Sequence, residues 1–328
     1  MGILFLKPVF KQMIWGGNRM RTEYGYDIPG ENTGECWAIS AHPQGDCLIA
    51  TGEYAGMALS QLWNEHRELF GNAEGDRFPL LTKIIDAQSD LSIQVHPDDR
   101  YAGENENGSL GKMECWYILD CDENAKIIIG HHAKTKQQLE EMVHGARWEE
   151  LIREISVKKG DFFQINPGCV HAIKGGTLIL ETQQNSDITY RLYDYDRLQD
   201  GKLRPLHIKQ SLDVITVPFE EITGTDVVRT SGDALSDAND LSKFQKKTIN
   251  DWFEQLITCE YYTVWKAQVN GKAMIIQDQK FLLGSVIDGN ATMDGCEVKK
   301  GDHFILPVDV VDVKVEGNAT FIFSAMVE

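Results

Sequence analysis

Two polar side chains stand next to each other at the end of an apolar run in "LSIQVHPDD" (91–99). Side chains alternate across a strand, so Gln94 and His96 lie on one face while Ile93 and Val95 lie on the other. Pro97 then ends the strand. Such a pair is either a solvated strand edge or two ligands of something bound there. This choice decides which chemistry the sequence supports.

Glu114 in "GKMECWYIL" and His171 in "PGCVHAI" occur in a similar context, at the end of an apolar strand or beside a Pro/Gly turn. Taken singly, each of these residues can equally be a polar group satisfied by ordinary hydrogen bonds. Taken together, Gln94, His96, Glu114 and His171 offer an amide, two imidazoles and a carboxylate. This is a plausible ligand set for a divalent transition metal.

The elements that must position these residues are mostly short strands bounded by Gly, Pro, Asn or Asp, such as "LLTKIID", "CWYILD" and "TLILETQ". The pattern predicts a mainly β protein, as a sandwich or barrel. Helical spacing occurs near 57–71 and near 134–155, and Gly145 is expected to divide the second stretch into two short helices. We expect both stretches to be small helical insertions on a β domain.

The composition becomes polar between about residues 221 and 250, and strand patterns resume after it. We therefore predict a catalytic domain over 1–220, a connection over 221–250 and a smaller β domain over 251–328.

A short sequence motif occurs once in each of the two predicted domains. "VKKGDFFQINPG" (157–168) is followed by His171, whereas "VKKGDHFILPVD" (298–309) is followed by no histidine. Coincidence in hairpin chemistry is the alternative to duplication. The second domain is expected to hold no metal, and His303 to be an ordinary strand residue.

Composition excludes several classes of partner. The net charge is −18, from 32 basic and 50 acidic residues, which disfavours nucleic acid and anionic membranes. An anionic small molecule remains compatible if lysines or arginines gather locally. We expect the N-terminal residues not to be a signal peptide, there is no long apolar run, and the seven cysteines are scattered without a C-x-x-C pair. We expect a cytoplasmic protein, and the sequence leaves its oligomeric state open.

Several motifs, in their order along the chain, resemble those of type I phosphomannose isomerases, in particular their short bacterial form. The resemblance runs from about residue 8 to 215 and is carried by "IWGG", "QVHPDD", "GKMECWYIL", "PGCVHAI" and "GGTLILETQQNSDITYRLYDYDR". It implies a zinc enzyme of the cupin superfamily, with two cupin-like β-barrel (jelly-roll) domains. It also implies that Zn²⁺ is bound by Gln94, His96, Glu114 and His171.

The same resemblance implies that Arg191 is catalytic and that Lys83 and Lys112 bind substrate. Asp187 lies four residues before Arg191, so on one strand both would share a face and Asp187 could orient Arg191 or move a proton. An ordinary surface ion pair is the alternative. Lys83 stands inside an apolar run, where its amine must either reach solvent or face a site that holds an anion.

The resemblance implies a zinc-dependent aldose–ketose isomerase that interconverts mannose 6-phosphate and fructose 6-phosphate through an enediol(ate). The positive metal site would stabilise the charged oxygen, and Arg191 would stay protonated at any relevant pH. The proton-transferring base stays open among Asp187, a histidine, a lysine and a water on the metal. No G-x-x-x-x-G-K-[ST] loop is present, which removes the main support for a kinase or ATPase.

Two other functions compete with this prediction. A cupin metal oxygenase usually binds iron through several histidines, so Gln94 and the candidate lysines speak against it. A non-catalytic or altered-specificity sugar-phosphate-binding cupin is disfavoured by the presence of the full ligand set together with Arg191.

Overall fold

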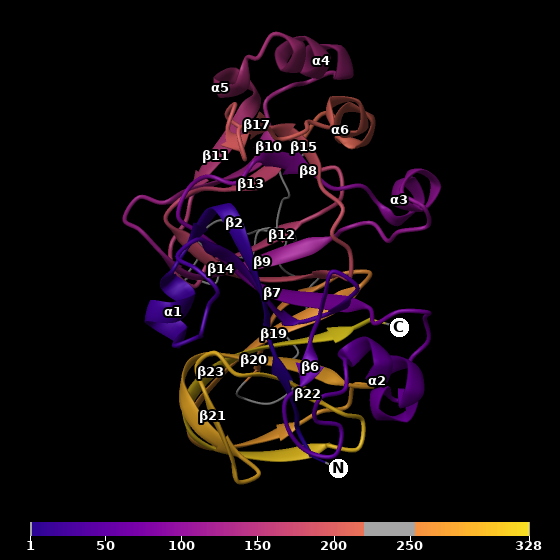
Figure 1. The fold of residues 1–328 in the computed structure, drawn as a ribbon, viewed down its shortest axis with the longest axis vertical. Helices are drawn as coiled ribbons and strands as arrows, with labels where there is room; N and C mark the ends of the chain where they lie inside the picture. Colours follow the sequence, from indigo (N-terminus) through magenta and orange to yellow (C-terminus); the bar gives the residue numbers. More distant parts are fainter. Residues whose placement is uncertain (1, 220–252, 328) are drawn as a thin grey trace, which may run out of the picture.

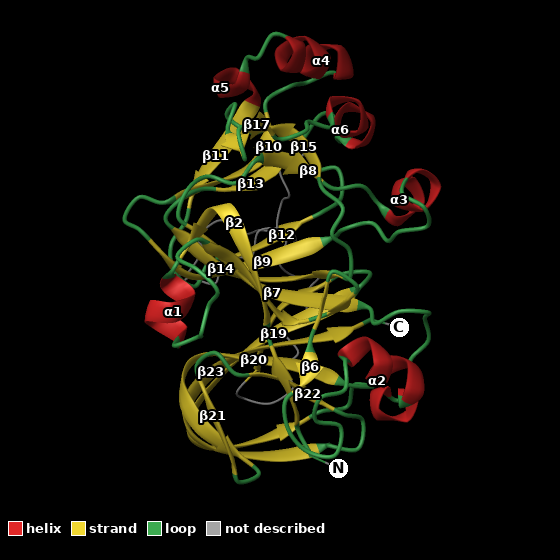
Figure 2. Cartoon of the chain, viewed as in Figure 1, coloured by secondary structure: helices red, strands yellow, loops and turns green. Residues whose placement is uncertain are grey.

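Strands form most of this protein, whose computed structural model describes residues 2–219 and 253–327 (Figure 1). The connection predicted over 221–250 lies outside the described residues. Three larger sheets carry the strands, and the helices lie at the periphery (Figure 2). The prediction of a mainly β protein with small helical segments is confirmed.

The central sheet has six strands in the order β12-β9-β14-β7-β2-β3, and every pairing in it is antiparallel. Every residue of its two middle strands, β7 and β14, is buried. Both faces of the sheet are therefore covered at these strands, even at polar positions such as Lys83 and Glu181. The strands are β2 (Val9–Gly17), β3 (Thr33–Ile39), β7 (Leu80–Ala87), β9 (Glu114–Cys121), β12 (Phe162–Ile165) and β14 (Thr177–Gln184).

A second sheet of five strands, in the order β11-β10-β13-β8-β15, lies above the central sheet in Figure 1. Isoleucines and aromatic residues from both sheets share one buried core, which includes Ile85, Trp116, Ile129 and Ile173. The strands are β8 (Ile93–Val95), β10 (Lys126–His131), β11 (Ile152–Ser156), β13 (His171–Ile173) and β15 (Tyr190–Tyr193). The site described below lies between these two sheets.

The helices are short, and three of them bury apolar side chains against strands of the five-stranded sheet. The stretch predicted near 57–71 contains α2 (Leu59–Glu65) and the 3₁₀ turn η1 (Arg67–Phe70). The others are α1 (Arg19–Tyr24), α3 (Asp99–Asn105), α4 (Lys136–His144), α5 (Trp148–Leu151) and α6 (Ile208–Val214). Within the described ranges, none of these helices has the length and apolarity to cross a membrane.

The helical prediction near 134–155 extends too far. Helices α4 and α5 occupy its first part, but its last residues belong to strand β11, which pairs with β10 through Ile152↔His131 and Ile155↔Ile127. Pairing with the edge of an existing sheet overrides the helical spacing, because tertiary contacts routinely outweigh local propensity.

The third sheet is built from both ends of the chain. Strands β1 (Leu4–Lys7) and β6 (Leu48–Ile49) continue it beyond β22, through pairs such as Leu4↔Ile305. The sheet therefore does not follow the chain order on which the division into 1–220 and 251–328 is based, and that division stays a prediction. Its C-terminal strands are β18 (Phe253–Thr258), β19 (Tyr262–Ile276), β20 (Leu282–Met293), β21 (Cys296–Lys299), β22 (His303–Leu306) and β23 (Asp312–Met326).

The two V-K-K-G-D segments form turns of the same kind. Asp161 accepts a hydrogen bond from the backbone of Lys158 at 3.1 Å, and Asp302 accepts one from Lys299 at 2.8 Å. His303, which follows the second turn, is buried between the Tyr26 hydroxyl at 2.9 Å and the Ser285 hydroxyl at 2.8 Å. These contacts make it a hydrogen-bonded core histidine.

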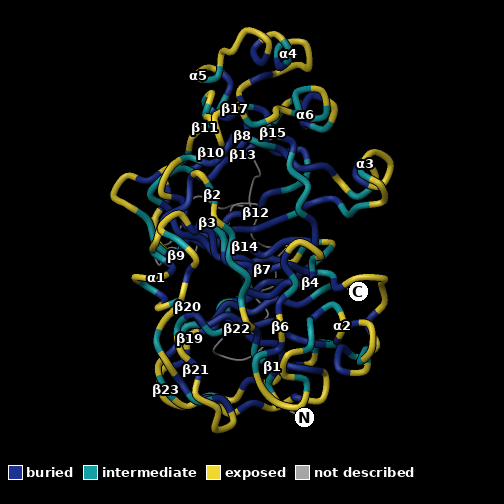
Figure 3. The backbone as a smooth tube through the Cα atoms, in the orientation of Figure 1, coloured by how far each residue is buried: buried dark blue, intermediate teal, exposed yellow. Residues whose placement is uncertain are grey.

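The small remaining strands are β4 (Ala41–His42), β5 (Gly45–Asp46), β16 (Leu198–Gln199) and β17 (Lys202–Leu203). Buried chain concentrates in the large sheets, while exposed chain lies mainly in loops and outer helices (Figure 3).

Candidate metal and substrate site

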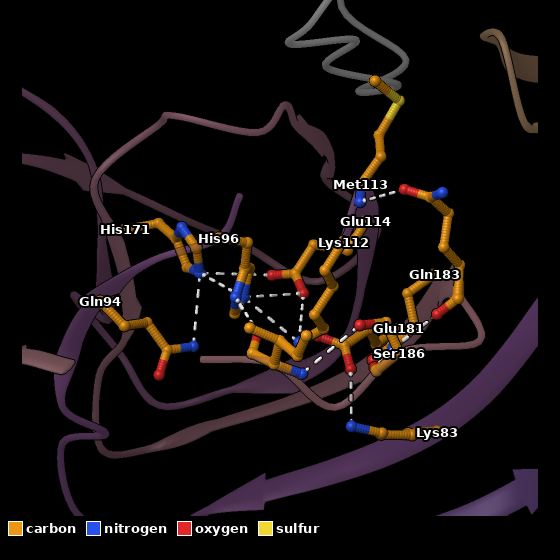
Figure 4. Close-up of polar contacts among 12 residues, drawn as sticks. Lys83, Gln94, His96, Lys112, Met113, Glu114, His171, Glu181, Gln183 and Ser186 are labelled. Atoms are coloured by element: carbon orange, nitrogen blue, oxygen red, sulfur yellow. Dashed lines mark hydrogen bonds and ion pairs between the residues drawn. The ribbon is translucent and has the colours of Figure 1, made fainter. Parts of the chain in front are cut away.

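Three predicted metal ligands meet in the buried space between the central and the five-stranded sheets (Figure 4). His96 directly follows β8, Glu114 begins β9 and His171 begins β13. The Nε2 atoms of His96 and His171 are 3.1 Å apart, and Glu114 carboxylate oxygens lie 3.4 Å from the first and 3.5 Å from the second. Strand ends that are distant in sequence thus deliver two nitrogens and a carboxylate to one point.

The fourth predicted ligand, Gln94, lies beside them. Sheet register places Gln94 directly opposite His171 on β13 and opposite Arg191 on β15. Directly opposite residues share a face of the sheet, so these side chains form one row. The Gln94 side-chain nitrogen is 3.3 Å from His171 Nε2, and rotating the amide by half a turn would present its oxygen at that place.

Hydrogen bonds to the backbone orient both imidazoles. His96 Nδ1 is 2.8 Å from the carbonyl of Ile188, and His171 Nδ1 is 2.9 Å from the carbonyl of Cys169. Because a carbonyl only accepts, each Nδ1 carries the proton and each Nε2 presents a lone pair to the cluster. Burial lowers the pKa of His171 and lowers that of His96 to about 3, so both rings are neutral. Neutral imidazole is the form that binds metals.

A divalent cation fits this donor set. Both carboxylate oxygens of Glu114 are buried and receive no hydrogen bond of good geometry, and two imidazole lone pairs point to the same place. Buried acceptors normally have a hydrogen-bond or metal partner, so this convergence indicates a cation site. Among the described residues, this is the cluster of His, Cys, Asp and Glu side chains spaced for a metal ion.

Lys112 contributes an ammonium group to the same cluster. Its Nζ is 2.7 Å from a Glu114 oxygen and 3.2 Å from His96 Nε2. Burial alone would lower the pKa of Lys112, but the charges of Glu114 and Glu181 raise it above its usual value. Burial opposes ionisation of Glu114 as well, yet the Lys112 ammonium holds the pKa of that carboxyl well below its usual range. The two form a buried ion pair.

A second buried carboxylate, Glu181, lies next to this ion pair. Register pairs Glu181 with Lys83 on β7 and with Trp116 on β9. Its oxygens lie 3.5 Å from Lys83 Nζ and 3.2 Å from the Trp116 indole nitrogen, which donates to it. Burial, with a smaller contribution from the charge of Glu114, raises the pKa of Glu181 to about 7.

Lys83 is held inside the protein rather than reaching solvent. Its side chain is buried, and besides Glu181 it approaches Glu35 at 3.8 Å. Of the two alternatives from the sequence, the structure therefore favours a lysine that faces a site. The anions that it contacts are the protein's own carboxylates.

A pocket of about 640 Å³ opens onto this cluster. Its wall carries polar and charged side chains from both sheets and from the segment after β15, among them Lys83, Gln94, Lys112, Glu181, Asp187, Arg191 and Arg204. A volume of this size lies in the usual range for small-molecule sites. The predicted substrate-binding and catalytic residues thus share one cavity with Gln94, and Lys112 on the cavity wall contacts His96 and Glu114.

The prediction that Asp187 and Arg191 share one face of a strand is wrong, while their catalytic roles stay a prediction. Strand β15 begins at Tyr190, so Asp187 lies in the preceding loop and the alternation of a strand does not apply to it. Asp187 approaches His42 at 3.5 Å, while Arg191 donates to the carbonyl of Pro205 at 2.9 Å. Both side chains nevertheless line the same pocket.

Comparison with known proteins shows to which family the chain belongs. The model of "Phosphomannose isomerase type I, catalytic domain" matches residues 3–120, and that of "Mannose-6-phosphate isomerase, cupin domain" matches residues 253–326. Mannose-6-phosphate isomerase ManA of Bacillus subtilis (strain 168) is 50% identical over 326 residues, covering 98% of both chains. The chain belongs to the type I phosphomannose isomerase family.

Other comparisons agree. A mannose-6-phosphate isomerase of Streptococcus mutans is 45% identical over 98% of this chain and 97% of its own. The crystal structure of the mannose 6-phosphate isomerase from Bacillus subtilis matches with a TM-score of 0.88 and 48% identity, covering 99% of this chain and 100% of that one. The predicted family, its enzymatic nature and the cupin-like β fold are confirmed.

Sequence reasoning missed several residues of the isomerase's pocket, among them Glu181 and Arg204. Glu181 carried a signal that was available, because it is a charged residue inside the apolar run "TLILETQ" just as Lys83 is in "LLTKIID". Arg204 carried none, since it stands in a loop without a motif. It lies 3.1 Å from the buried Asp194 and reaches the pocket wall.

Proposed function

We propose that this isomerase interconverts mannose 6-phosphate and fructose 6-phosphate with a zinc ion held by Gln94, His96, Glu114 and His171. The observation that carries the proposal is the convergence of two neutral imidazoles and a buried carboxylate beside a pocket rich in cations. When bound, zinc supplies positive charge that stabilises negative charge developing on a sugar oxygen. An assay that follows fructose 6-phosphate formation from mannose 6-phosphate tests the proposal.

Arginines of the pocket support recognition of the phosphate group. Arg191 and Arg204 both line the cavity, and Asp194 lies beside them as a shared carboxylate neighbour. Burial lowers the pKa of Arg204 to about 10, so it stays protonated at neutral pH. Guanidinium groups bind phosphate through paired N–H donors, and a local excess of positive charge lets a chain of net charge −18 hold an anion.

Glu181 is the residue that we assign to proton transfer at carbon. As a carboxylate it would remove the proton from C2 of mannose 6-phosphate and return it to C1 of the enediol(ate), while a hydroxyl proton moves from O2 to O1. A general base works best when its pKa lies near the working pH, and a pKa of about 7 meets that condition. The Trp116 indole and Lys83 hold the carboxylate from two sides.

Replacing Arg191 with alanine is expected to lower kcat about 100-fold to 1,000-fold and to raise KM less than tenfold. Arg191 lies opposite Gln94 in the row of site residues, where its fixed charge holds a sugar oxygen or phosphate in the reacting position. Arg191→Lys keeps the positive charge but lacks the planar guanidinium group. Its kcat should therefore lie between that of the wild type and that of Arg191→Ala. Steady-state kinetics of both variants checks this, and an unchanged kcat in Arg191→Ala removes its catalytic role.

A further inference from the structure

Lys112 stands where a cation is needed. Its ammonium touches Glu114 at 2.7 Å and His96 Nε2 at 3.2 Å, and its side chain is only 6% exposed (Figure 4). The groups that meet around it are the buried Glu114 carboxylate and the Nε2 atoms of His96 and His171, which are the proposed metal-binding atoms. Lys112 therefore provides positive charge at the place that the metal ligands share.

We propose that Lys112 is a built-in counter-cation that neutralises the ligand set while no metal is bound, and that by competing with the metal it sets the affinity of the site. The inference rests on the proposed metal site and goes beyond it, because it assigns to a pocket lysine a role in metal binding. In the metal-free protein, Lys112 is the cation that contacts Glu114. A buried carboxylate without a cation is strongly unfavourable, and Lys112 removes that cost.

Metal binding brings a second positive charge to this cluster. A divalent ion among these ligands is close to the ammonium of Lys112, and charges of like sign repel more strongly in the protein interior than in water. Metal binding must therefore displace the ammonium from Glu114 or accept the repulsion. In either case the affinity for metal is lower than that of the same ligands without the lysine.

Glu181 gives the displaced ammonium a second place. Glu114 and Trp116 lie on one face of β9, and their partners across β14 are Gln183 and Glu181. The two carboxylates are therefore diagonal neighbours on one face, a spacing that a lysine side chain can span. The charge of Glu181 also acts on Lys112 in the structure. Glu181 thus offers the Lys112 ammonium a carboxylate neighbour that is not one of the proposed metal ligands.

Lys112→Met tests the proposal because methionine has a similar shape and no charge. We expect the variant to bind Zn²⁺ about tenfold to 100-fold more tightly than the wild type, measured by competition with a chromophoric chelator. We also expect the metal-free variant to unfold at a lower temperature than the metal-free wild type, with a smaller difference after zinc loading. A purely substrate-binding lysine would leave zinc affinity unchanged.

Lys83→Met is the matched control, since it removes the same charge from a lysine that pairs with Glu181 and Glu35 instead of Glu114. Its zinc affinity should change by less than about threefold. Lys112→Gln provides the same test if the methionine variant fails to fold, and Lys112→Arg should restore the stability of the metal-free form. Unchanged or weaker zinc binding in Lys112→Met or Lys112→Gln overturns the inference alone. A wild type that binds no zinc overturns the proposed metal site as well.

Discussion

Replacing Glu114 with glutamine is expected to abolish zinc binding and to lower kcat/KM by at least about 1,000-fold. Glutamine has almost the same shape, but it removes the negative charge that balances the metal in a set of neutral ligands. It also leaves Lys112 buried without its nearest carboxylate, which costs about 3–5 kcal/mol of stability. Zinc content per chain after dialysis and steady-state kinetics measure the two effects.

Glu154→Gln is the control for that variant. Glu154 also pairs with lysines, Lys126 and Lys174, but it lies at the protein surface away from the pocket. Zinc content, activity and stability should stay close to those of the wild type, because surface ion pairs contribute little. A Glu114→Gln variant that keeps both its zinc and its activity would show that the carboxylate is not a ligand.

Replacing Glu181 with glutamine is expected to lower kcat about 1,000-fold while zinc stays bound. The amide keeps the size of the side chain and a possible contact with Trp116, but it cannot take a proton from carbon. Because the carboxylate is the active form and its pKa is about 7, kcat of the wild type should fall as the pH is lowered through 7. The pH dependence of kcat, measured with both proteins, checks this assignment.

Glu35→Gln is the control for Glu181→Gln, because it removes a neighbouring carboxylate and leaves Glu181 in place. Glu35 is the other carboxylate near Lys83, at 3.8 Å, and it also lines the pocket. Its removal should lower kcat less than tenfold, because Lys83 keeps Glu181 as a partner. If Glu181→Gln retains more than a fifth of the wild-type kcat, the proton is carried by another group, and Asp187 is then the next carboxylate of the pocket to be tested.

Much of the metal site can be predicted from the sequence because its residues contradict their surroundings. Gln94, His96, Glu114 and His171 are polar groups at the ends of strands that are otherwise apolar. Since strand ends in a sandwich converge, such residues have a common place to meet. The structure places His96, Glu114 and His171 together and sets Gln94 opposite His171, and their role as metal ligands stays a prediction.

Other parts of the molecule depend on long-range contacts that no local pattern contains. Arg204 enters the pocket from a loop whose course is set by Asp194 and by neighbouring carbonyl groups. Strand β11 forms in a segment whose apolar residues have helical spacing, because β10 offers an edge with which the segment can pair. The joining of β1 to β22 pairs residues about 300 positions apart, as in Leu4↔Ile305. Strand register and the pairing of sheet edges, rather than local secondary-structure propensity, decide each of these features of the fold.

The most direct measurement of the central claim is a coupled assay of fructose 6-phosphate formed from mannose 6-phosphate. The purified protein is assayed as isolated, after removal of metal with a chelator, and after addition of one equivalent of Zn²⁺. We predict turnover in the first sample, loss of nearly all activity in the second and recovery in the third, with about one zinc per chain. Full activity in the metal-free protein would contradict the account.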